Sequence, residues 1–263
     1  MPKILLLGTS RLHRPFAKRV EKRLISNIRT SVEVVFGKMG YFHTAAEMLQ
    51  LIRFAKTPDC LPLELREYIF RIEPRLTTPL NEFDSELESA IREGRPYRLA
   101  LPLGEIDCLV MEVSSLSVNC HSESRCVLHT NPNIGRNVSY AEIYPAGYYA
   151  KFEPQMPVSR NETSLDSLAS QLRSIRAELP HVEIIVLGHL RSQNYPNAGR
   201  DRIHELLVEA CSLSGCIYFD TAPFLDEYGY AVVGGVSDTH HLSHEGEYAI
   251  GQALQDVIQS MHR

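Results

Sequence analysis

A short polar block near the C-terminus holds residue types that are suited to acid–base chemistry. The block runs from Ser237 to Gly246 and places Asp238 three residues before His241. A carboxylate in that position can accept the Nδ1 proton of the imidazole, which fixes the ring tautomer and leaves Nε2 as a base. We expect this pair on a loop just ahead of a helix. An isolated Asp-x-x-His pattern is more often a solvated polar loop.

A base needs a group to activate, and the best candidate lies at the other end of the chain. Gly8-Thr9-Ser10 directly follows the apolar run of residues 3–7. Such a continuous apolar run closed by glycine is typical of a buried parallel strand. Ligands of open parallel sheets bind at the carboxyl edge, so Ser10 is a candidate nucleophile at that edge.

These two blocks resemble those of the SGNH hydrolases, the GDSL-like esterases and acyltransferases. In that family a nucleophilic serine stands in a Gly-Asp-Ser-like block after the first strand. An Asp-x-x-His block precedes the last helix and often continues as His-x-Ser-x-x-Gly. Here Thr9 replaces the usual aspartate of the first block, whereas Leu242, Ser243 and Gly246 continue the second block well.

The resemblance implies a triad in which Ser10 attacks an acyl carbonyl, His241 is the base and Asp238 orients the imidazole. It also implies oxyanion donors. In the family a glycine after the second strand offers its backbone N–H, and Gly40 or Gly37 stands in that region.

The third block departs from the family pattern. The family has Gly-x-Asn-Asp there, and its asparagine side chain completes the oxyanion hole. This chain has no asparagine in that region before Asn119. A serine hydroxyl can also donate one hydrogen bond, so Ser114 or Ser115 is the expected substitute. The departure indicates a divergent member of the family.

Three further side chains are candidates for contact with a substrate. Arg11 follows the nucleophile, and it either binds an anionic substrate, solvates the loop or pairs with Glu112 at the end of a buried strand. His43 either touches substrate or caps the helix that begins at Thr44. His189 follows an apolar strand at the same sheet edge, where it contacts substrate or bonds to backbone.

Other assignments of the site stay open at this point. Asp220 ends another strand and competes with Asp238 as the triad acid. His240 is a second possible base, although the spacing favours His241. His240 and His244 are four residues apart, and on a helix they could share a metal ion. The spacing to the carboxylate and to Gly246 favours the triad, so no metal is expected.

The order of apolar runs predicts a single α/β domain over residues 1–263. We expect a three-layer sandwich with a mainly parallel five-stranded sheet and helices on both faces, of the flavodoxin-like SGNH type. The expected strands are residues 3–7, 32–36, 106–113, 182–187 and 216–219. A proline-punctuated helical insertion or lid is expected at 57–104, and 116–162 fits either short strands or a substrate loop.

Composition narrows the range of partners. The chain of 263 residues carries a formal net charge of −5, which gives no electrostatic footprint for nucleic acid or an anionic membrane. No apolar run approaches the length of a membrane span or a signal-peptide core, so a soluble, cytoplasmic protein is expected. No glycine-rich phosphate loop is present, and no cofactor is expected.

The sequence therefore predicts serine-dependent acyl transfer. The reaction is either ester hydrolysis or O-acyl transfer to a sugar or a small metabolite, with small-molecule or saccharide partners. One alternative is a non-catalytic binding domain on a degenerate version of this fold, which the replaced aspartate and the missing asparagine motivate. A metal-dependent hydrolase that uses His240 and His244 is a further alternative. The sequence does not indicate the oligomeric state.

Overall fold

The computed structural model describes residues 1–16, 33–34, 42–57, 62, 65, 103–128 and 157–262. The contacts divide the chain into two compact units. Unit 1 comprises Met1–Ala45, Leu101–Ser115 and Ser164–Arg263, and unit 2 comprises Ala46–Ala100 and Leu116–Thr163. Gly37, Gly40 and nearly all of the insertion predicted at 57–104 lie outside the described residues. The single-domain assignment stays a prediction.

Unit 1 is built on a parallel sheet of five strands in the order β2-β1-β3-β7-β8. Numbered along the chain within this sheet, the order is the 2-1-3-4-5 of flavodoxin-like folds. The predicted α/β class and all five predicted strands are confirmed. The strands are β1 (Lys3–Leu7), β2 (Glu33–Val34), β3 (Cys108–Val113), β7 (Glu183–Gly188) and β8 (Ile217–Phe219).

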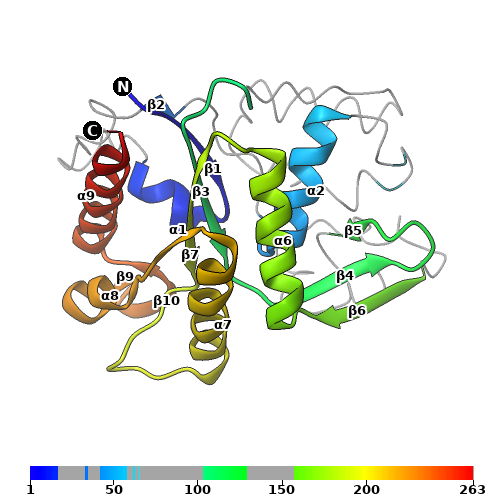
Figure 1. Cartoon of the computed structure of the whole chain (residues 1–263). Coiled ribbons are helices and arrows are strands. Elements are labelled where there is room, and N and C mark those ends of the chain that lie inside the picture. The colour runs from blue at the N-terminus through cyan, green and yellow to red at the C-terminus, as the bar shows by residue number, and fades with distance from the viewer. Residues whose placement is uncertain are drawn as a thin grey trace. The chain divides into compact units, whose positions relative to one another are not determined.

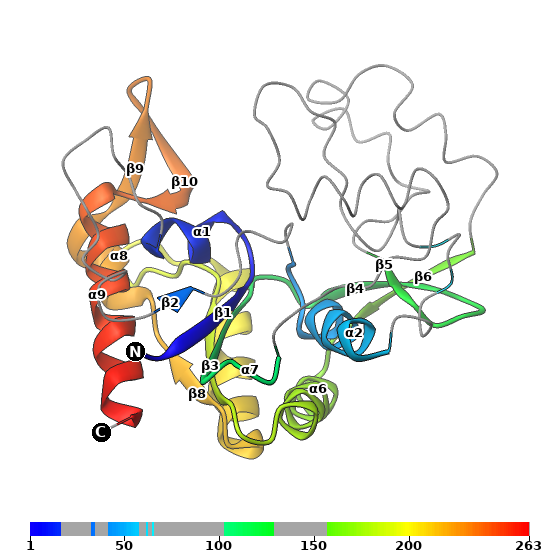
Figure 2. The ribbon, with the colours of Figure 1, turned by 90° about the horizontal axis from the view of Figure 1, so that it is seen from above.

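Helices cover both faces of this sheet. Figures 1 and 2 show α6 (Leu165–Glu178) and α7 (Ala198–Ser214) on one face, and α1 (Ser10–His13) and α9 (His244–Met261) on the other. The short helices η1 (Arg14–Phe16) and α8 (Ala222–Tyr228) pack against α9. A parallel sheet between two helical layers buries both of its faces, which explains why most residues of its strands are apolar.

Alternate residues of the strands supply two cores. The side chains at every second position point to the same face. On the α9 face, buried side chains of the strands meet those of the helix, and each buried aliphatic side chain contributes about 1.5 to 3 kcal/mol. This cluster contains Ile4, Leu6, Cys108, Val110, Ile185, Leu187, Leu12, Leu242, Ile250, Leu254 and Ile258.

Polar side chains begin the long helices where the sequence indicates a start. The Ser164 hydroxyl accepts the Ser167 N–H and caps α6. Asn197 caps α7 by accepting the Arg200 N–H, and Ser243 caps α9. Each cap satisfies a backbone donor that the first turn leaves unpaired.

Unit 2 contains an antiparallel sheet in the order β5-β4-β6. Its strands are β4 (Ser117–His121), β5 (Val127–Leu128) and β6 (Val158–Glu162). Of the two readings of 116–162, the described residues therefore support short strands. Most of helix α2 (Ala45–Lys56) also belongs to this unit. Its Gln50 amide donates to the Val127 carbonyl at 2.9 Å and accepts from the Val127 N–H at 2.8 Å. Both backbone hydrogen-bonding groups of Val127, in the short edge strand β5, are therefore paired.

A hairpin in unit 1 corrects one prediction. Asp238 and His241 lie in strand β10 (Val236–Leu242), which pairs with β9 (Tyr230–Val233), and not on a loop ahead of the last helix. The turn is Gly234-Gly235, with φ values of 59° and 83° that favour glycine. Valines flanking a Gly-Gly pair are a hairpin signal.

None of the helices in the described ranges is long and apolar enough to cross a membrane.

Gly8 allows the chain to leave β1 in close contact with β3. A Cβ atom at this position would lie 2.8 Å from Cβ of Glu112 and 3.0 Å from Cδ2 of Leu12. We expect Gly8→Ala to lower the free energy of unfolding by about 1 to 3 kcal/mol, because buried atoms must shift to admit the methyl group. Urea denaturation measures the change.

Gly104→Ala is the matched control, because a Cβ atom at Gly104 would meet nothing within 4 Å. We expect this variant to stay within about 0.5 kcal/mol of the parent. Equal stability of the two variants would contradict the close approach at Gly8.

Candidate active site

The clearest feature of the site is the hydrogen bond between Asp238 and His241. Nδ1 of His241 lies 2.7 Å from Oδ2 of Asp238, and the His240 N–H donates to Oδ1 at 3.0 Å. Burial acts to raise the pKa of Asp238, but the hydrogen bonds from His241 and His240 outweigh it and hold the pKa below its ordinary value. An ionised carboxylate at Nδ1 selects the tautomer that has its lone pair on Nε2.

A bulge in β10 makes this contact possible. The ladder pairs Asp238 with Ala231 and resumes only at Leu242 with Tyr230, so its register skips residues 239–241. In a regular strand, residues three apart point to opposite faces. The bulge turns the His241 ring back to the carboxylate that precedes it.

Ser243 and Gly246, at the end of the polar block that holds Asp238 and His241, shape the start of helix α9. The Ser243 hydroxyl accepts the Gly246 N–H at 3.2 Å and caps α9. A Cβ atom at Gly246 would lie 3.1 Å from Cβ of Tyr228, so the first turn of α9 packs closely on α8. The Ser-x-x-Gly pattern therefore fixes where the helix after His241 begins.

Ser10 is the first residue of α1, directly after β1. Cα atoms of α1 and β10 lie within 8 Å of one another. Leu12 of α1 and Leu242 of β10 also belong to the same buried cluster. The element that carries the candidate nucleophile and the strand that carries the candidate base are therefore neighbours in unit 1.

A buried carboxylate organises the loop around Ser10. Glu112 on β3 is only 2% exposed and accepts the backbone N–H of Thr9 at 3.0 Å and the Thr9 hydroxyl at 2.5 Å. Nε of Arg11 donates to the other carboxylate oxygen of Glu112, Oε1, so the predicted pairing of Glu112 with Arg11 is confirmed.

The electrostatics of this network explain the threonine in the first block. Burial alone would raise the pKa of Glu112, but the charge of Arg11 and the hydrogen bonds from Thr9 and Arg11 lower it. An aspartate at position 9 would place a second carboxylate against Glu112, and two carboxylates sharing a buried site repel. Thr9 donates to the carboxylate instead.

His43 joins the ends of β1 and β3. Its carbonyl accepts the N–H groups of Ser114 at 2.9 Å and Ser115 at 3.0 Å, and its Nδ1 lies 3.0 Å from the Ser114 hydroxyl. The N–H of Phe42, one residue earlier, donates to the Gly8 carbonyl at 3.5 Å. The Ser114 hydroxyl, one of the two proposed donors, is therefore in contact with the His43 ring.

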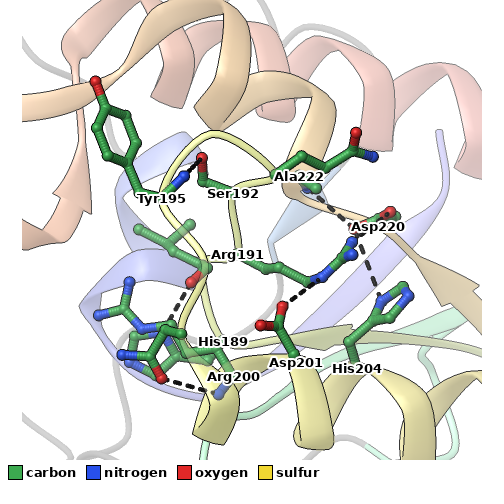
Figure 3. Close-up of polar contacts among 12 residues, drawn as sticks. His189, Arg191, Ser192, Tyr195, Arg200, Asp201, His204, Asp220 and Ala222 are labelled. Atoms are coloured by element: carbon green, nitrogen blue, oxygen red, sulfur yellow. Dashed lines mark hydrogen bonds and ion pairs between the residues drawn. The ribbon is translucent and has the colours of Figure 1, made fainter.

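His189 lies beyond the end of β7, where Figure 3 shows it beside Arg200. Its Nδ1 contacts the Leu190 carbonyl at 3.3 Å, as the backbone-bonded alternative expects. Burial, with the charges of Arg11 and Arg200, lowers the pKa of His189 to about 3. The imidazole is neutral at physiological pH.

Asp220 takes part in a different network, drawn in Figure 3. Its carboxylate accepts the Ala222 N–H at 3.0 Å at the start of α8, and it lies 3.8 Å from Nη1 of Arg191 and 4.0 Å from Nδ1 of His204. Arg191 also pairs with Asp201 at 3.0 Å. Between the two candidate acids, Asp238 is the one that bonds to His241.

The histidine pair proposed as a metal site does not share a helix. His240 lies in β10, whereas His244 is the first residue of α9. Within the described part of the chain, no group of three or more His, Cys, Asp or Glu side chains could hold a metal ion.

Comparisons with known proteins give distant likenesses. The model of a family described as TviD N-terminal domain matches residues 2–122. Among solved structures, LAE5, an alpha/beta hydrolase enzyme from the metagenome of Lake Arreo in Spain, is 13% identical, with a TM-score of 0.39 over 98% of this chain and 95% of its own. Axe2, an acetylxylan esterase from Geobacillus stearothermophilus, is 13% identical, with a TM-score of 0.38 over 98% and 94%.

Comparison with curated proteins finds no match. The strand order of the sheet in unit 1 is itself that of a flavodoxin-like fold.

Removal of the Glu112 charge tests the buried network. We expect Glu112→Gln to lower the free energy of unfolding by about 3 kcal/mol near pH 7, because Arg11 then stays largely buried without its carboxylate. The folded pKa of Glu112 is lower than its ordinary 4.5, so the carboxylate stabilises fully above that pH and progressively less as the pH falls below it. Urea denaturation at several pH values should show the difference between parent and variant shrinking in acid.

Glu209→Gln, on the exposed side of α7, is the matched control and should change stability by no more than about 0.5 kcal/mol. A loss at Glu112→Gln that is equal at all pH values would argue against an ionised carboxylate.

The pKa of His189 is open to direct measurement. We expect the NMR chemical shifts of the His189 ring protons to stay constant from about pH 8 to about pH 5. The His189→Gln variant, which lacks these signals, assigns them. The unfolded chain takes up this proton near the ordinary pKa of 6.5, so His189 makes the fold less stable as the pH falls below that value. A titration of the folded protein with its midpoint near 6.5 would contradict the burial of this ring.

Proposed function

We propose that the chain is a divergent SGNH-type serine hydrolase or acyltransferase, in which Ser10 is the nucleophile, His241 the base and Asp238 the orienting acid. One observation carries the proposal: the 2.7 Å contact between the imidazole and the carboxylate, on a strand that neighbours the helix begun by Ser10. A serine, a histidine and an aspartate on adjacent elements at the carboxyl edge of a parallel sheet form a recurrent arrangement for nucleophilic acyl transfer.

In the first half of the proposed reaction, Oγ of Ser10 attacks the carbonyl carbon of an ester and Nε2 of His241 takes the hydroxyl proton. The tetrahedral intermediate then collapses, the bond to the leaving alcohol breaks, and that alcohol receives the proton from His241. In the second half, water or an acceptor hydroxyl attacks the acyl-enzyme and gives its proton to His241. Collapse of the second intermediate returns the proton to Ser10 and releases an acid or a new ester.

Asp238 supports both halves of this cycle without changing its own protonation. Its lowered pKa keeps it ionised, so it stabilises the imidazolium that forms each time His241 accepts a proton. The backbone N–H groups of Ser10 and Gly40, with the Ser115 hydroxyl, are the proposed oxyanion donors. Each such donor contributes about 3 kcal/mol of transition-state stabilisation in comparable enzymes.

His43, His189 and Arg11 are the proposed substrate contacts at this edge. His189, kept neutral by its surroundings, would act as a hydrogen-bonding group and not as a cation. The pairing of Arg11 with Glu112 would fix the direction of its side chain. We propose a small-molecule or saccharide ester as acyl donor, with water, a sugar or a small metabolite as acceptor and no cofactor. The net charge of −5 argues against a nucleic-acid partner.

Labelling with a fluorophosphonate tests the nucleophile. We expect the native protein to be labelled on the peptide that contains Ser10, as read by mass spectrometry, and Ser10→Ala to lose the label. Ser167→Ala, on the exposed surface of α6, is the control and should label like the parent. A native protein that neither labels nor hydrolyses short-chain esters would favour the non-catalytic binding domain.

Replacement of the acid tests the tautomer argument. We expect Asp238→Asn to lower kcat for a short-chain ester by about 10⁴-fold, because the amide can hold His241 in the wrong tautomer. Circular dichroism should show the fold retained, since the side chains have nearly the same shape. A kcat within a few-fold of the parent would remove Asp238 from the triad.

A further inference from the structure

The bulge that carries His241 leaves polar groups of the β10 backbone without partners in the ladder. The register of the ladder skips Thr239, His240 and His241. The carboxylate of Asp238 accepts the freed N–H of His240. The carbonyl of Thr239, which the ladder does not pair, needs a donor from elsewhere, because an unpaired buried carbonyl costs free energy.

Arg200, in the first turn of α7, supplies that donor. Its Nη2 donates to the Thr239 carbonyl at 2.9 Å, and its Nη1 donates to the Tyr230 hydroxyl at 2.8 Å. Tyr230 is the residue of β9 at which pairing with β10 resumes. One planar guanidinium therefore contacts both strands of the hairpin, with one contact inside the bulge and one at its end.

Arg200 is itself firmly placed. Its backbone N–H donates to the Asn197 side chain that caps α7, and α7 packs on β7 and β8. The hairpin projects beyond the layers of unit 1 in Figure 2, whereas Figure 3 shows Arg200, in the first turn of α7, beside His189. The guanidinium thus ties the projecting hairpin to α7, which packs on the sheet.

The partners of Arg200 are neutral. Among the described residues it forms no ion pair, and its guanidinium donates to a backbone carbonyl and a phenol. Its fork of donors suits two acceptors held at fixed positions. An ion pair with a surface carboxylate would not require this placement.

We infer that Arg200 is a positioning residue for the catalytic base: it clamps the bulge of β10 and so holds His241 in the geometry that serves Ser10. The inference rests on the proposed function for its catalytic meaning. The clamp acts through Thr239, which stands between Asp238 and His241 in the sequence. Loss of the clamp would free the bulge to refold toward a regular strand, in which the ring and the carboxylate separate.

Kinetics with a short-chain ester give the first test. We expect Arg200→Ala to lower kcat by about 10-fold to 100-fold with KM nearly unchanged, because a displacement of about 1 Å of a catalytic group has effects of that size. Guanidinium ion added to the medium should restore part of the loss. Tyr230→Phe, which removes only the Nη1 contact, should have a smaller effect, and Arg173→Ala on the exposed side of α6 should have none.

A double-mutant cycle separates the clamp from a general loss of stability. In an Asp238→Asn background the Asp238–His241 pair is already disabled. Arg200→Ala should then lower kcat by less than about 3-fold. An equal loss in both backgrounds would overturn the inference. Arg200→Lys should have a kcat between those of the parent and Arg200→Ala. It replaces the alanine variant in these tests if that variant fails to fold.

NMR tests the clamp without activity. The Nδ1 proton of His241, bonded to Asp238, should give a low-field resonance in the parent and in Ser10→Ala, and Arg200→Ala should broaden or abolish it by solvent exchange. An unchanged resonance in Arg200→Ala overturns the clamp. If the resonance is lost there while the parent shows no Ser10-dependent activity, the proposed function fails and the clamp stands.

Discussion

A buried negative charge constrains the part of unit 1 where its strands end. Glu112 lies inside the molecule, and an isolated carboxylate there would be strongly unfavourable. Its two oxygens are satisfied by Thr9 and Arg11, which flank Ser10 on both sides. The need to neutralise this charge therefore fixes the backbone of the loop that carries the candidate nucleophile. Gly8 completes the arrangement, because any side chain there would collide with Glu112 itself.

The candidate base is held by a second and different device. His241 stands in a bulged hairpin strand, and its orientation depends on hydrogen bonds that substitute for missing ladder bonds. Asp238 supplies some of these bonds and Arg200 supplies another. One half of the site is thus organised by a buried charge and the other half by satisfied backbone groups. Both halves lie in unit 1.

The sequence predicted the sheet well because its strands are continuous apolar runs, and Lys3–Leu7 and Cys108–Val113 need little context to be recognised. It also predicted the pairing of Glu112 with Arg11, since a carboxylate ending a buried strand requires a cation. The hairpin differs from the predicted loop because the polar Asp-x-x-His block lacks the alternation of a strand, and its turn signal, Gly234-Gly235, lies ahead of that block. Arg200 carries no local signal at all, because its partners lie about thirty to forty residues away in sequence.

The most direct test of the account is the distance between the two groups that must exchange a proton. An experimental structure of the whole chain should place Oγ of Ser10 within about 3 Å of Nε2 of His241, the reach of a nucleophile–base hydrogen bond. A separation well over that reach, with the two side chains on opposite edges of the sheet, would contradict it.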